Sequence, residues 1–143
     1  MKVDFWQLSS DPVEKVVALI AQRVLDQGER LLVVSADPDQ REAISRGLWS
    51  AGPESFLANG EAEGARPAAQ PVLLSETPDA PNDASHVIFA DGEYRVTQGF
   101  ARAFLLFDET TVQEARKVWK SLDDGEGERS FFRQDGGKWV KVA

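Results

Sequence analysis

The chain has 143 residues, a formal net charge of −8 and a hydrophobic share of 42%. This length and composition are typical of one soluble globular domain, and we expect a single domain covering residues 1–143. It has no cysteine and one histidine, His86, so disulfides, cysteine zinc sites and multi-histidine metal centres are excluded, and we expect no metal and no cofactor. No apolar run approaches the ~20 residues that span a bilayer, and the opening stretch MKVDFWQL lacks the apolar centre of a signal peptide. We therefore expect a cytoplasmic protein without membrane contact.

The first third of the chain alternates strand and helix patterns. β-Branched and aromatic residues predict a strand at 3–8, and a helical apolar pattern begins after Asp11, the expected N-cap, and ends at Gly28. A near-continuous apolar run predicts a strand at 31–36 that is buried on both faces. Asp37, followed by Pro, is the expected cap of a second helix. The order strand–helix–strand–helix favours a parallel sheet with right-handed crossovers.

The remaining elements follow a loosely patterned segment. Residues 59–84 are rich in Gly, Ala, Pro, Asn and Asp, and only 71–75 within them looks like a strand. Further strands are predicted at 86–90 and 102–107, and a helix at about 109–122. The tail RSFFRQDGGKWVKV indicates a β-hairpin or an extended arm. We predict a single Rossmann-like α/β domain whose mainly parallel sheet has helices on both faces.

Positive charge is concentrated in the last fifth of the chain. Residues 115–143 carry seven Lys or Arg and five Asp or Glu, whereas the residues before them carry nine and nineteen. On the predicted helix, Arg116 and Lys120 lie one turn apart beside the apolar stripe, with Trp119 at the border. This pattern suits an acidic peptide that ends in an aromatic residue, and it is also the pattern of a solvated basic helix face. The acidic remainder disfavours direct nucleic-acid binding.

Two other stretches have competing interpretations. AFLLFDE, ending in Asp108 and Glu109, resembles the magnesium-binding half of a nucleotide site, and a small nucleotide-dependent enzyme is the alternative function. No Gly-rich loop with Lys and Ser or Thr accompanies it, which favours a buried strand followed by an Asp that caps the next helix. In LWSAGPESF, Trp49 and Phe56 either close over the core edge or form an aromatic patch for a protein partner.

Several motifs together resemble the chi subunit of bacterial DNA polymerase III holoenzyme. They are, in chain order, DFWQL, ERLLVVSADPDQREAISRGLW, PESFLANG with the following EAEG, PVLL and ARKVWK. Together these motifs span nearly the whole chain, and the resemblance rests on their order and spacing. The resemblance implies a Rossmann-like fold and no catalytic activity.

The resemblance also implies partners and the residues that contact them. The family links the clamp-loader complex to single-stranded DNA-binding protein and holds the acidic, Phe-terminated tail of that protein. The tail-binding residues correspond to Arg116, Trp119 and Lys120, with Leu105 as an apolar wall; Trp119 stands where the family more often has Tyr. The contact with the psi subunit of the clamp loader, or its equivalent, corresponds to Trp49 and Phe56. A helicase is implied as a further partner of the same surface.

Overall fold

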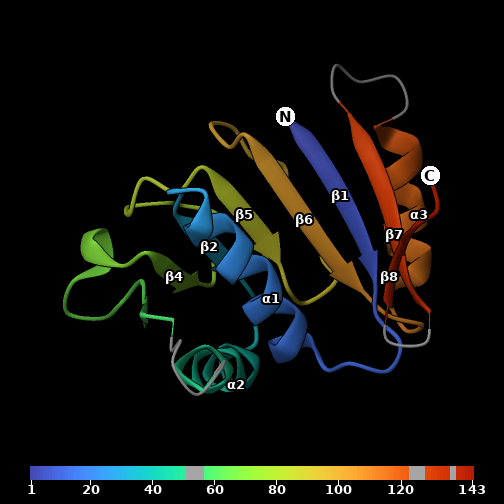
Figure 1. Cartoon of the computed structure of the whole chain (residues 1–143). Coiled ribbons are helices and arrows are strands. Elements are labelled where there is room, and N and C mark those ends of the chain that lie inside the picture. Colours follow the sequence, from blue (N-terminus) through green and yellow to red (C-terminus); the bar gives the residue numbers. More distant parts are fainter. Residues whose placement is uncertain (51–56, 123–127, 136–137) are drawn as a thin grey trace.

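One eight-stranded sheet runs through the residues that the structure, a computed structural model, describes: 1–50, 57–122, 128–135 and 138–143. The order is β3-β4-β2-β5-β6-β1-β7-β8, and every neighbouring pair is parallel except β7 and β8 (Figure 1). The strands are β1 (Lys2–Gln7), β2 (Leu31–Val34), β3 (Asn59–Glu61), β4 (Val72–Ser75), β5 (His86–Phe89), β6 (Arg102–Phe107), β7 (Arg129–Asp135) and β8 (Lys138–Lys141). The α-helices are α1 (Val13–Asp26), α2 (Pro38–Trp49) and α3 (Val112–Ser121), and Pro67–Ala69 forms a 3₁₀ turn. The predicted α/β fold is confirmed.

The two faces of the sheet carry two separate apolar clusters. Leu31 and Val33 of β2 pack with the apolar residues of α1 and α2. Their neighbours Leu32 and Val34 pack with those of α3. Because successive residues of a strand point to opposite faces, α1 and α2 cover one face and α3 covers the other, as predicted. Figure 1 shows α3 beside β7 and β8, with α2 toward the other end of the sheet.

The start of α1 differs from the prediction, while its end agrees with it. The N-cap residue is Pro12, and no side chain caps the helix. One carboxylate oxygen of Asp11 instead accepts a hydrogen bond from the side chain of Gln134 on β7 (2.6 Å), and the other pairs with Lys15 (3.3 Å). At the other end Gly28 has φ +76°, and the amide of Glu29 donates to the carbonyl of Val24 (3.2 Å). This is the Gly-terminated helix end that the sequence predicts.

The start of α2 agrees with the prediction from the sequence, whereas the short strand β3 after it was not predicted. Asp37 accepts a hydrogen bond from the amide of Asp39 (2.9 Å), which satisfies an otherwise unpaired donor of the first turn. Strand β3 lies within the segment that has no strand pattern. It is held by parallel pairing with β4 and by the side chain of Asn59, which accepts from Ser45 (2.6 Å) and donates to the carbonyl of Leu57 (2.9 Å).

The tail forms a hairpin that widens the sheet. Strand β7 pairs in parallel with β1, and β8 returns antiparallel along β7. Within the described residues, no helix combines the length and the apolar character needed to cross a membrane.

Candidate functional site

A groove of about 320 Å³ lies between α3 and the sheet. One side of it comes from α3, through Val112, Ala115, Arg116, Trp119 and Lys120. The other side comes from β1, β6 and the C-terminal hairpin segment, through Gln7, Phe107, Phe131, Val142 and Ala143. Three of the four residues assigned to tail binding from the sequence therefore meet at one groove.

The rim of the groove on the helix side is cationic. Arg116 and Lys120 are both exposed, and within the described residues neither takes part in an ion pair. Lys117, on the outer side of the same helix, does have a partner, because its ammonium lies 3.2 Å from a carboxylate oxygen of Glu114. The two rim cations are thus available to an anionic ligand.

Trp119 is held in place by three neighbours. Its ring meets Phe5 edge-on at a centroid distance of 5.0 Å and Phe131 at 6.0 Å. The guanidinium of Arg129 lies 4.3 Å from the ring centroid and also donates to the carbonyl of Trp119. Edge-on ring contacts and a cation–π contact of this kind fix the orientation of the ring. Trp119 therefore presents one defined edge to the groove, as a fixed wall rather than a mobile side chain.

Leu105 does not line this groove. It is 0% exposed and packs in the apolar cluster beneath α3. Phe107, two residues further along β6 on the same face, lines the groove instead. Leu105 and Phe107 share one strand and one face, but the strand passes under the helix at Leu105 and reaches the groove only at Phe107.

Trp49 lies on the other face of the sheet. It is the last residue of α2 and is 48% exposed. A second groove, of about 480 Å³, runs beside it between α1 and α2 and is lined by Leu19, Gly47 and Ser50, among others. Leu19 is itself 37% exposed. Phe56, the other residue of the predicted patch, lies outside the described residues.

Asp108 serves the local turn before α3. One of its carboxylate oxygens accepts from the amide and hydroxyl of Thr110 (2.8 and 2.6 Å). These hydrogen bonds, the Thr110 hydroxyl foremost, hold the pKa of Asp108 below its usual value. The buried strand before it is confirmed, but Asp108 is not the helix cap, because it stands three residues before the N-cap Thr111 and its carboxylate is used within the turn.

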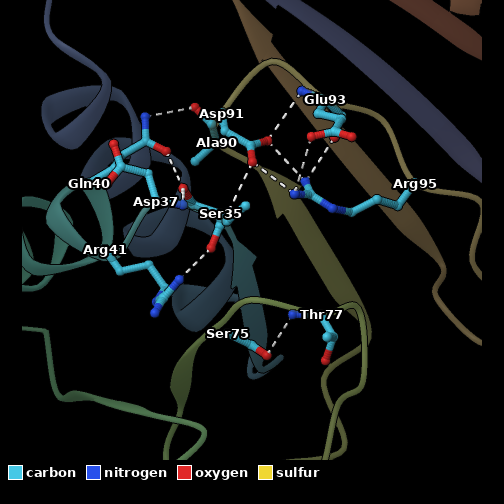
Figure 2. Close-up of polar contacts among 11 residues, drawn as sticks. Ser35, Asp37, Gln40, Arg41, Ser75, Thr77, Ala90, Asp91, Glu93 and Arg95 are labelled. Carbon is cyan, nitrogen blue, oxygen red and sulfur yellow. Dashed lines mark hydrogen bonds and ion pairs between the residues drawn. The ribbon is translucent and has the colours of Figure 1, made fainter.

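A polar network closes the carboxyl ends of β2 and β5, where open α/β sheets commonly bind ligands (Figure 2). Arg41 donates to the carbonyl of Ser35 (2.7 Å), and Gln40 donates to that of Ala90 (3.1 Å). These side chains are engaged with the protein itself.

Asp91 anchors the same network at the end of β5. Its carboxylate accepts from the guanidinium of Arg95 (2.8 Å) and from the amide of Ala36 (3.0 Å). Burial opposes ionisation, but these hydrogen bonds outweigh it and hold the pKa of Asp91 below its usual value. The network joins the loops after β2 and β5.

His86 is a buried polar residue of β5. It is 8% exposed, its Nδ1 lies 2.7 Å from the Ser85 hydroxyl, and its ring stacks near Phe104 at 6.3 Å. Burial is the main cause that lowers the pKa of His86; Arg102 lowers it further, and Glu29 opposes both.

A comparison with family models links this geometry to known proteins. The model described as DNA polymerase III chi subunit, HolC, matches residues 1–128, which include Arg116, Trp119 and Lys120 and end just before β7. No curated protein matches the chain. Since the match spans most of the 143 residues, the chain belongs to the DNA polymerase III chi subunit family, HolC, and is a component of the DNA polymerase III complex in DNA replication.

Proposed function

We propose that the protein is a non-catalytic replication adaptor that links single-stranded DNA-binding protein to the clamp loader. In this proposal the acidic, Phe-terminated tail of the first partner occupies the groove between α3 and the sheet. A clamp-loader subunit, psi or its equivalent, contacts the surface around Trp49. A helicase is a further partner for the adaptor.

The observation that carries the proposal is the pairing of cations and apolar surface at the groove. Arg116 and Lys120 stand on its rim, and Trp119 forms a fixed aromatic wall. Peptide carboxylates gain charge-assisted hydrogen bonds from such a rim, each contributing about 1.5–3 kcal/mol when well formed. The contrast with the net charge of −8 adds support, because this rim is cationic on an acidic molecule.

The floor of the groove suits an aromatic side chain. Phe107 of β6 and Val112 and Ala115 of α3 are apolar and line the groove together with the cationic rim. A terminal Phe placed there would contact Trp119 while its own carboxylate stays near the rim. Both chemical features of the tail thus have a counterpart within one groove.

The clamp-loader contact is supported by the exposure of Trp49. A Trp that is 48% exposed beside a groove with Leu19 is an apolar surface that a protein partner could cover. Trp is also among the residues enriched at the energetic centres of interfaces. The position on the opposite face from α3 leaves both surfaces accessible at once.

Calorimetric titration with a synthetic acidic tail peptide tests the tail-binding function. We expect Arg116→Ala to weaken binding by about tenfold or more, since about 1.4 kcal/mol corresponds to one decade. The matched control is Lys117→Ala, which removes a cation from the same helix but from outside the groove and should change affinity little. Binding should also weaken as salt rises, and a peptide without its last Phe should bind less tightly. The proposal would be rejected if three affinities were equal: that of the wild-type protein for the peptide, that of Arg116→Ala for the peptide, and that of the wild-type protein for the truncated peptide.

A further inference from the structure

We propose that the β7–β8 hairpin forms the second wall of the peptide groove and that Arg133 on β7 is a third cation that contacts the acidic peptide. This inference rests on the proposed function, because it concerns the same groove and the same class of ligand. It assigns a role to residues beyond the region that the family model matches, which ends at 128.

The alternation of side chains along β7 fixes the face on which Arg133 lies. Phe131 packs in the cluster beneath α3, whereas Phe132 packs in the cluster on the α1 face. Because strand residues two apart share a face, Arg133 lies on the α3 face together with Phe131. In the parallel register Arg133 is paired with Gln7, which lines the groove.

The hairpin also supplies apolar surface to the groove. Phe131 and Val142 both line it. The amide of Val142 donates to the carbonyl of Phe131 (2.7 Å), so the segment after β8 is tied to β7 at this point. The side of the groove that faces α3 is therefore built from backbone-paired strands and does not depend on a loose tail.

Arg133 stands beside the groove-lining Gln7 rather than in the lining itself, and it is available to a ligand there. Its side chain is exposed, and within the described ranges it takes part in no ion pair. Arg129, on the same face of β7, is instead committed to the ring and carbonyl of Trp119. A peptide lying in the groove would thus have Arg116 and Lys120 along one side and Arg133 along the other. Cations on both sides hold an extended acidic chain in register, which a single helix face does not.

The hairpin offers a matched control in Lys141. This residue is exposed and cationic like Arg133, but it pairs with Phe132 in the antiparallel register. Directly paired residues share a face, so Lys141 lies on the α1 face, away from the groove. Replacing either cation by Gln removes one positive charge from the same hairpin, and therefore changes the net charge and the long-range attraction equally.

The experiment is calorimetric titration of the full chain with a short synthetic peptide rich in Asp and ending in Phe. We expect Arg133→Gln to weaken binding by about threefold or more, the scale of a partly solvated charge contact, and to lower the salt dependence. Lys141→Gln should change affinity by less than about twofold. Thermal unfolding should show equal melting temperatures for both variants, because both side chains are exposed.

The outcomes separate this inference from the function on which it rests. If the wild-type protein binds and Arg116→Ala weakens binding, but Arg133→Gln behaves like Lys141→Gln, the hairpin role is wrong and the tail-binding function stands. If the wild-type protein does not bind the peptide, both proposals fall. If Arg133→Gln weakens peptide binding at unchanged melting temperature while Lys141→Gln does not, the second cationic wall is established.

Discussion

Two cations of similar chemistry have different tasks at the groove because of what each one touches. Arg129 lies over the ring of Trp119 and donates to its backbone, so it positions the aromatic wall. Arg116, one turn from Lys120, stays in solvent and is free to meet a ligand. A count of positive charges treats these residues alike, whereas the contacts distinguish a residue that positions Trp119 from one that is available to a ligand.

His86 makes a prediction about pH at the residue scale. Its pKa in the folded protein lies below the ordinary value of 6.5, mainly because of burial, with Arg102 acting in the same direction and Glu29 against it. The folded state therefore binds the proton less well than the unfolded state does. The contribution of His86 to the free energy of unfolding should be constant above about pH 6.5. It should fall as the pH drops below this value toward the pKa in the folded protein.

The measurement is urea unfolding of wild-type protein and His86→Gln between about pH 8 and pH 5. The wild-type free energy of unfolding should decline with falling pH more steeply than that of the variant. Carboxylates titrate in both proteins, so the difference between the two curves isolates His86. Parallel curves would mean that burial does not disfavour the charged imidazole.

At the scale of elements, buried strands and capped helices could be predicted from the sequence, while long-range pairings could not. The strand predicted at 31–36 is found as β2, which ends at Val34, and its apolar residues at every position fit a strand covered on both faces. Asp37 caps α2 because its partner lies only two residues away. Asp11 does not cap α1; one carboxylate oxygen accepts from Gln134, distant in sequence, and the other from Lys15. Strand β3 has no pattern of its own, since its pairing to β4 alone defines it.

The same distinction explains how much of the candidate site could be predicted. Arg116, Trp119 and Lys120 share one helix, so a period of 3.6 residues is enough to bring them together. The opposite wall depends on β7 lying next to β1, a contact that no local pattern reveals. Phe131, which lines the groove, was missed for this reason, although the aromatic and basic residues of the tail were a usable signal.

The cap of α2 gives a prediction at this scale. Asp37→Ala removes the acceptor for the amide of Asp39 and should lower the free energy of unfolding by about 1 kcal/mol. Asp37→Asn keeps a capping oxygen and should cost much less. Chemical denaturation of the three proteins checks this. An equal loss in the free energy of unfolding for both variants would show that the charge of Asp37 stabilises the helix, and not its capping hydrogen bond.

At the scale of the whole molecule, the sheet separates the two surfaces that we propose for partners. The groove at α3 lies on one face, and Trp49 with the groove between α1 and α2 lies on the other. An adaptor needs its two partners to bind without competing for space. A wide sheet buried on both faces provides this separation with a rigid core, because the same strands support both surfaces.

This arrangement predicts that the two contacts can be lost independently. Trp49→Ala should weaken binding to the clamp-loader complex and leave tail-peptide affinity unchanged, and Arg116→Ala should do the reverse. Because Trp49 is 48% exposed, its replacement should cost far less than the roughly 3–5 kcal/mol typical of a buried Trp. Size-exclusion chromatography with the clamp-loader complex, calorimetry with the peptide and thermal unfolding of each variant provide the three readouts. A large stability loss in Trp49→Ala would assign this residue to the core edge. A loss of peptide affinity in the same variant would instead mean that the two faces communicate through the sheet.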